Sequence, residues 1–312
     1  MIRYRVTHRT TYEYELPVSL CHNVAHLEPR SLPGQVCVRS DIEVSPAPKV
    51  RGRHLDPFGN MSTYFSIETP HRVASVGAVS EVLVDDHPPL TPAGPSWETC
   101  LSGPPTDGSA PFGGIAPPRG EDNAIAAEFR LESPFVPLSD DLADYAWQCF
   151  TPGRPVLEAA ADLTRRIHEE FTFDPDFTTV ATPVMKVFQH KRGVCQDFAH
   201  VMLACLRSIG LAARYVSGYL ETDPPPGQPR LEGADASHAW VSLHVPDLGW
   251  FDYDPTNNCR PGGRHIVVAV GRDYGDVTPL KGVILGGGRH KLKVTVDVLR
   301  IADEPVWPET AI

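Results

Sequence analysis

One cysteine lies where a helix is expected to begin, a position that suits a nucleophile. A glycine turn at Gly193 precedes Cys195, and an almost continuously apolar run follows until Gly210. Apolar residues on nearly every side predict a buried helix over 195–209, and Gly210 supplies the left-handed stop that helices favour. Unpaired backbone N–H groups and the positive end of the helix dipole gather at its first turn. That setting stabilises a thiolate, while the alternative interpretation is a buried structural cysteine.

A histidine and an aspartate stand at neighbouring ends of an expected β-hairpin. Alternating apolar residues predict two strands within 236–254, joined by a tight turn at 246–249. His238 opens the first strand and Asp254 closes the second, so the two ends lie side by side in an antiparallel pair. The carboxylate can hold the imidazole in one tautomer, and the imidazole can face the thiol of Cys195. Together the three residues predict a thiol acyl-transfer site.

The blocks that carry these residues resemble the transglutaminase-like superfamily, in particular a bacterial branch that has its own N-terminal domain. The matching core covers about 150–260, and Cys, His and Asp stand in the family's order. The resemblance implies a papain-like core with Cys195 as nucleophile, His238 as base and Asp254 as orienter. It leaves the reaction open, because members are similar to transamidases in some cases and to peptidases or amidases in others. The four blocks are Gly193–His200, Ala213–Tyr219, Ser237–Trp240 and Asp254–Asn257.

Other residues are candidates for the same site. Asp252 is an alternative orienter on the same strand face, but Asp254 lies at the strand end and matches the family's Asp-Pro-Thr. An oxyanion hole needs donors about 3 Å from the developing charge. The backbone N–H of Cys195 is the first donor expected. Gln189 lies six positions earlier, an offset similar to that of the papain-type oxyanion glutamine. His200, close to the nucleophile, is expected to be a packed residue and not a second base.

Composition limits the classes of binding partner and the cellular compartment expected for the protein. A net charge of −11 argues against a nucleic-acid surface or an anionic membrane as partner, and no apolar run is long enough to span a bilayer. The first residues lack an apolar signal core, and the seven scattered cysteines include no CxxC pair. These features favour reduced thiols in a cytoplasm. No zinc motif or EF-hand loop is found, so we expect no metal and no cofactor.

The order of elements predicts an α+β protein. Short β-branched and aromatic runs separated by Pro and Gly predict a β-rich N-terminal domain over 1–85. A Pro- and Gly-rich linker or surface excursion over 86–138 follows, and then a catalytic core over 139–312 in which the nucleophile's helix packs on an antiparallel sheet. A strongly alternating strand over 291–300 is expected to join either the core sheet or the N-terminal domain. Further helices are predicted at 140–150, 156–171 and 184–190, and a loop over 221–236 that rims the site.

Three functions are consistent with this pattern. The first is cysteine-dependent cleavage of an amide or isopeptide bond in a peptide or protein, through a thioester. The second is a protein-glutamine transamidase, in which an amine resolves the thioester in place of water. Dry aromatic walls would favour the amine, and Tyr219 and Trp240 are the expected substrate-binding walls, with Trp250 as a further candidate. The third is a non-catalytic peptide-binding scaffold, against which the intact Cys-His-Asp set argues. The oligomeric state stays open.

Overall fold

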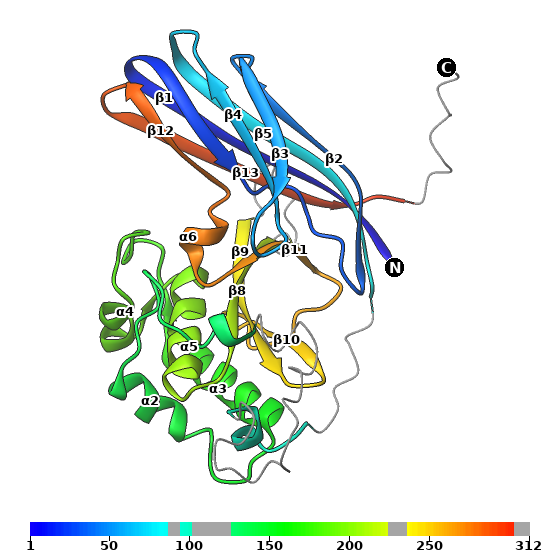
Figure 1. Cartoon of the computed structure of the whole chain (residues 1–312), viewed down its shortest axis with the longest axis vertical. Coiled ribbons are helices and arrows are strands. Elements are labelled where there is room, and N and C mark those ends of the chain that lie inside the picture. Colours follow the sequence, from blue (N-terminus) through cyan, green and yellow to red (C-terminus); the bar gives the residue numbers. More distant parts are fainter. Residues whose placement is uncertain (87–93, 102–125, 224–235, 303–312) are drawn as a thin grey trace, which may run out of the picture.

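The fold of the 312-residue chain is described by a computed structural model over residues 1–86, 94–101, 126–223 and 236–302. It joins a large antiparallel sheet to an α+β core, in which helices pack on a second antiparallel sheet (Figure 1). The helices gather beside the strands β8 (Ala213–Leu220) and β9 (Ala236–Val245) of the core, and the large sheet lies beyond one end of these strands. The fold class expected from the sequence is therefore confirmed.

The large sheet is built around one long strand, β1 (Ile2–Ala25). The first half of β1 pairs with β5 (His71–Val84) and with β13 (His290–Arg300), and its second half pairs with β4 (Met61–Ile67) and β12 (Leu280–Gly286). Two outer strands, β2 (Gln35–Ser45) and β3 (Val50–Leu55), pair with β5 and β4. Side chains from both halves meet in one apolar cluster, which includes Val18, Ile42, Phe65 and Val76. The sheet thus curls around its own core.

The C-terminal strands belong to this sheet and not to the four-stranded sheet of the α+β core. β13 pairs with β1 from Tyr4↔Arg300 to Tyr14↔His290, and its alternating residues bury Val296 and Val298. This is one of the two placements that the alternating pattern left open. It differs from a catalytic core that runs without a break over 139–312. Alternation alone could not indicate which sheet β13 joins, because an alternating strand can complete either one.

The catalytic-type sheet has the order β10-β9-β8-β11, with antiparallel neighbours throughout. Helix α5 (Cys195–Ser208) packs on β8 and β9, and every residue from 197 to 207 is buried. The expected central helix is therefore confirmed. The strands are β8 (Ala213–Leu220), β9 (Ala236–Val245), β10 (Gly249–Tyr253) and β11 (His265–Gly271). The other helices are α2 (Asp140–Trp147), α3 (Val156–Glu170), α4 (Val184–His190) and α6 (Tyr274–Val277), and β6 (Thr172–Phe173) pairs in parallel with β7 (Arg192–Gly193).

Parts of the expected linker pack into the core. Trp97 and Cys100, in the short 3-10 helix η1 (Trp97–Cys100), are buried, and so are Phe129 and Val136. These stretches are therefore part of the packed protein: Trp97 and Val136 join the cluster that contains the helices, and Phe129 shares a second cluster with Ala212. The remainder of the linker, 87–93 and 102–125, and most of the loop expected to rim the site, 224–235, lie outside the described residues.

One apolar cluster runs through both parts of the molecule. It holds Tyr4, Val6 and Val298 from the large sheet together with Tyr215 and Tyr219 from β8. Beside it, the hydroxyl of Tyr4 donates to Glu221 Oε2 at 3.0 Å, and Arg300 donates to both carboxylate oxygens of Glu221 at 2.7 Å. In the part of the chain that the structure describes, no helix is both long and apolar enough to cross a bilayer.

Candidate active site

The start of α5 is fixed by a buried carboxylate. Asp197 Oδ2 accepts from the backbone N–H of Val194 at 2.8 Å and from the hydroxyl of Thr178 at 2.6 Å. Burial raises the pKa of Asp197 against the opposing effect of these two hydrogen bonds. A Cβ at Gly193 would lie 2.6 Å from Asp197 Oδ2 and 2.8 Å from its Cβ, so only glycine fits there. This turn places Cys195 in the first turn of α5 with a partly exposed side chain.

His238 lies between the thiol and a carboxylate. Its Nε2 lies 2.8 Å from Asp254 Oδ2, and the thiol of Cys195 is near enough to the same imidazole to raise its pKa. Because Asp254 occupies Nε2, Nδ1 is the ring nitrogen left for the sulfur. The three side chains named from the sequence are therefore brought into one row. His238 is 8% exposed and Asp254 is fully buried, so water does not screen their interaction.

The carboxylate of Asp254 is held from both sides. Its Oδ1 accepts from the backbone N–H groups of Thr256 at 2.9 Å and Asn257 at 3.1 Å, within the turn that ends β10. Its Oδ2 accepts from Asn257 Nδ2 at 2.7 Å. Burial alone would raise the pKa of Asp254, but the hydrogen bonds from His238 and His265 outweigh burial and hold the pKa far below its usual range. Asp254 is therefore a carboxylate at any physiological pH.

His238 is correspondingly easy to protonate. Burial alone would lower its pKa, but the hydrogen bonds and charges of Asp254 and Cys195 outweigh burial and raise the pKa to about 10. At neutral pH the ring is an imidazolium that faces the sulfur. Such a cation stabilises a thiolate and can give a proton to a leaving amine.

A fourth side chain, His265, was not anticipated from the sequence. Its Nε2 lies 3.1 Å from the same oxygen of Asp254, and its side chain is buried. No local pattern marks it, because it opens β11, which is separated from β9 in the sheet by β8. His238, Asp254 and His265 offer ligand atoms within 4.8 Å of one another, a spacing that could suit a metal ion. The hydrogen bonds to Asp254 account for this spacing without an ion.

Trp240 forms the wall behind the row and takes the second aspartate. Its Nε1 donates to Asp252 Oδ2 at 3.0 Å, so Asp252 orients the indole while Asp254 orients His238. The indole is fully buried and meets the ring of His265 edge-on, with centroids 5.3 Å apart. It covers Gly218 on the neighbouring strand, where a Cβ would lie 2.5 Å from the ring. The ring is closed off from solvent, and a role for Trp240 in binding substrate stays a prediction.

The other predicted residues lie further from the row. The hydroxyl of Tyr219 lies 3.0 Å from His8 Nδ1 of β1, and its ring is buried, so its role in substrate binding also stays a prediction. Gln189 lies in the last turn of α4 with an exposed side chain, and its oxyanion role is likewise a prediction. His200 stacks on Phe135 at 5.6 Å, and burial lowers its pKa to about 4, so its ring is neutral and packed.

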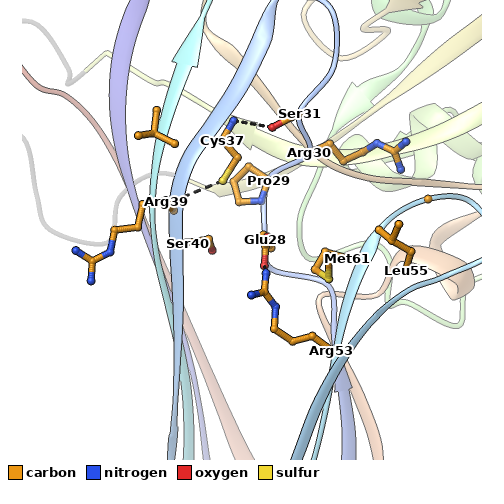
Figure 2. Close-up of a pocket in the computed structure, with 12 residues that line it drawn as sticks. Glu28, Pro29, Arg30, Ser31, Cys37, Arg39, Ser40, Arg53, Leu55 and Met61 are labelled. Atoms are coloured by element: carbon orange, nitrogen blue, oxygen red, sulfur yellow. Dashed lines mark hydrogen bonds and ion pairs between the residues drawn. The ribbon is translucent and has the colours of Figure 1, made fainter. Parts of the chain in front are cut away.

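A second cysteine lines a cavity of about 400 Å³ between the outer strands β2 and β3 (Figure 2). The thiol of Cys37 donates to the carbonyl of Arg39 at 3.6 Å, and the backbone N–H of Cys37 donates to Ser31 Oγ. Burial, and then the charge of Glu28, raise the pKa of Cys37 to about 11. Cys37 is therefore a protonated thiol at neutral pH, and the cavity does not repeat the chemistry at Cys195.

Comparison with known proteins follows the same division of the chain. Residues 4–83 match the bacterial transglutaminase-like N-terminal region, and residues 143–255 match the transglutaminase-like superfamily. An uncharacterised protein of Mycobacterium tuberculosis is 41% identical over 306 residues, which cover 95% of this chain and 92% of that one. A protein-glutamine gamma-glutamyltransferase of Pseudomonas aeruginosa is 34% identical over 128 residues, which cover 40% of this chain and 19% of the enzyme.

A solved structure from Cytophaga hutchinsonii, described as a candidate cysteine protease, has a TM-score of 0.70 to this chain. It covers 98% of this chain and 93% of its own, and at 17% identity the likeness concerns the fold. The sequence matches and the shared fold agree with the resemblance found in the four blocks. The chain belongs to the transglutaminase-like superfamily.

Proposed function

We propose that the chain breaks an amide or isopeptide bond through a thioester on Cys195 and passes the acyl group to water. The observation that supports this most is the row of thiol, imidazole and carboxylate at the start of α5. His238 Nε2 lies 2.8 Å from Asp254, and Cys195 is near enough to the ring to raise its pKa. Nucleophile, base and orienter in this order are the parts of a thiol acyl-transfer site. A peptide or protein is the proposed substrate.

His238 gives up one proton in the first half-reaction and takes another from water in the second. The sulfur of Cys195 attacks the carbonyl carbon, the C–S bond forms as the C–N bond breaks, and the imidazolium of His238 gives its proton to the leaving amine. Water then attacks the thioester, His238 takes a proton from this water, and the C–S bond breaks. The carboxylic acid product leaves and the ion pair of Cys195 and His238 is restored. Asp254 holds the ring in place throughout and stabilises its charge.

Transfer to an amine is the second candidate function. It is supported by the 34% identity over 128 residues to the Pseudomonas aeruginosa enzyme that is named as a protein-glutamine gamma-glutamyltransferase. Acylation is the same in both reactions, and only the acceptor of the acyl group distinguishes them.

Mass spectrometry of a peptide library incubated with and without a primary amine tests the proposal. The library should contain glutamine side chains and lysine–glutamine isopeptide bonds. We expect hydrolysis products, and an acyl adduct on Cys195 in acid-quenched protein. Dominant amine adducts at modest amine concentration would favour the transamidase instead.

Two variants complete the test. Cys195→Ala should form neither the acyl adduct nor the products, whereas Cys37→Ser removes a partly exposed thiol far from the row and should keep full activity. Peptide binding without any product or adduct in the unaltered chain would indicate a scaffold and end the proposal of catalysis.

A further inference from the structure

We propose that His265 is a positioning residue for the reaction at Cys195, because it donates a second imidazole N–H to Asp254 and so limits how tightly that carboxylate holds the proton of His238. The consequence of this arrangement for catalysis rests on the proposed function. The arrangement itself, two imidazoles on one carboxylate oxygen, can be tested without any activity.

Three donors converge on one oxygen. Asp254 Oδ2 lies 2.8 Å from His238 Nε2, 3.1 Å from His265 Nε2 and 2.7 Å from Asn257 Nδ2. An ionised carboxylate only accepts hydrogen bonds, so both ring nitrogens must carry a hydrogen. Asp254 is fully buried, and its negative charge is therefore shared among these donors and the two backbone N–H groups on Oδ1. Each hydrogen bond to Asp254 therefore weakens the pull of its negative charge on the other donors.

Packing against neighbouring rings holds His265 in the orientation that brings its Nε2 to Asp254. Trp240 meets it edge-on at 5.3 Å, and the ring centroid of His238 lies 6.0 Å away. Trp240 is in turn fixed by its hydrogen bond to Asp252 and by its close approach to Gly218. A ring that only filled space at this point would not need a nitrogen within hydrogen-bonding distance of Asp254.

The consequence for catalysis follows from the charges that face His238. These are the thiol of Cys195 from α5 and the carboxylate of Asp254 after β10, while Asp252 is turned to Trp240. Without His265 the carboxylate would pull more strongly on the remaining imidazolium proton. His238 would then be a weaker acid toward the leaving amine, and acylation would slow without any change in how substrate binds.

Proton NMR of protein labelled with ¹⁵N-histidine tests the geometry directly. Hydrogen bonds between an imidazole N–H and a carboxylate give slowly exchanging, low-field proton signals. We expect two such signals, one from His238 and one from His265. In His265→Leu one should vanish and the other should move further downfield. If the unaltered chain shows no such signal from His265, or if the His238 signal is unchanged in the folded variant, the inference is wrong.

Kinetics then test the positioning role. We expect His265→Leu to lower kcat about tenfold or more with KM unchanged, and His265→Gln, whose amide can still donate, to recover most of the loss. The control is His22→Leu, because His22 bonds Tyr64 in the large sheet at 2.8 Å and lies outside the row. Equal losses in the Leu and Gln variants would reduce His265 to a packing residue. If the unaltered chain turns over no substrate, the proposed function fails while the NMR result still decides the geometry.

Discussion

The nearby imidazole of His238 distinguishes the thiol of Cys195 from the other partly exposed thiols of the chain. Cys37 and Cys259 are also partly exposed, but burial raises the pKa of each to about 11. At pH 7 only about one in 10⁴ of such thiols is ionised, since each pH unit below the pKa lowers that fraction tenfold. Iodoacetamide reacts with the thiolate. We therefore expect alkylation at pH 7 to mark Cys195 far faster than Cys37 and Cys259, as followed by peptide mass spectrometry.

The role of His238 in this selectivity has its own control. His238→Ala should slow the alkylation of Cys195 by about tenfold or more, because the imidazolium that stabilises the thiolate is gone. The rate at Cys37 should not change, since its thiol bonds the carbonyl of Arg39 in the large sheet. Comparable rates at all three cysteines in the unaltered chain would contradict the prediction.

The proton on His238 makes the stability of the fold depend on pH in a defined direction. The pKa of His238 is raised to about 10 in the folded chain, against about 6.5 for an unfolded histidine. Between these values the folded state holds a proton that the unfolded state has lost, so the stabilisation declines as pH rises. It is fully present below about pH 6.5 and is lost as pH passes through about 10. The difference in unfolding free energy between the unaltered chain and His238→Ala should therefore shrink from pH 7 to pH 10, as measured by urea denaturation.

His200→Ala is the matched control for this measurement. His200 is also buried, but burial lowers its pKa to about 4, so folded and unfolded states are both neutral above pH 7. The difference in unfolding free energy between this variant and the unaltered chain should stay constant from pH 7 to pH 10. A constant difference for His238→Ala as well would mean that His238 is uncharged in the folded chain.

Strand β8 leaves room for Trp240 behind the row of Cys195, His238 and Asp254, because it has a glycine at position 218. A Cβ at Gly218 would lie 2.2 Å from the carbonyl oxygen of Ile266 and 2.5 Å from the indole of Trp240. Both neighbours are buried, so neither can easily move away. Gly218→Ala should destabilise the fold by about 1–3 kcal/mol, the usual cost of overpacking, and should slow the alkylation of Cys195. Urea denaturation and the labelling assay measure the two effects.

Gly52→Ala is the comparison for that variant. Gly52 lies on the exposed edge strand β3, and its Cβ would meet no atom within 4 Å. We expect a change in unfolding free energy within about 0.5 kcal/mol, as for ordinary surface positions. If Gly218→Ala were as mild as Gly52→Ala, Trp240 would not be held as tightly as its contacts indicate.

The sequence predicts the elements whose pattern is local. The helices near 140, 156, 184 and 195 lie where apolar spacing predicts them. Cys195, His238 and Asp254 could be paired because a helix start and two hairpin ends carry them, and because the four blocks resemble a known family. The role of Asp252 as partner of Trp240 needed coordinates, since alternation puts both aspartates on one strand face.

Contacts that depend on distant chain segments could not be predicted. His265 reaches Asp254 from a strand that is not next to β10 in the sheet. The strand over 290–300 alternates equally well for either sheet, and its pairing with β1 is decided by contacts with residues almost three hundred positions earlier. Local sequence holds no information on such a choice, because register and partner depend on the assembled core.

The whole molecule is held together by its C-terminal strands, which return to the N-terminal sheet after the catalytic-type sheet is complete. Val6 and Val298 from the large sheet share one buried cluster with Tyr215 and Tyr219 of β8, and Glu221 is bound by both Tyr4 and Arg300. Two parts with a common core are expected to unfold together, since neither keeps its buried surface without the other.

Unfolding should therefore be a single transition when two different probes follow it. Tryptophan fluorescence reports mainly the catalytic-type part, because Trp97, Trp147, Trp240 and Trp250 lie there, whereas far-UV circular dichroism also reports the large sheet. Val298→Ala, which removes two methyl groups from a fully buried side chain, should lower both transitions together by about 2 kcal/mol. Val294→Ala, on the same strand but 46% exposed, should leave both within about 0.5 kcal/mol. If Val298→Ala shifted only the circular dichroism transition, the two parts would be separate folding units, and the large sheet could not be what fixes β8 behind the row of Cys195, His238 and Asp254.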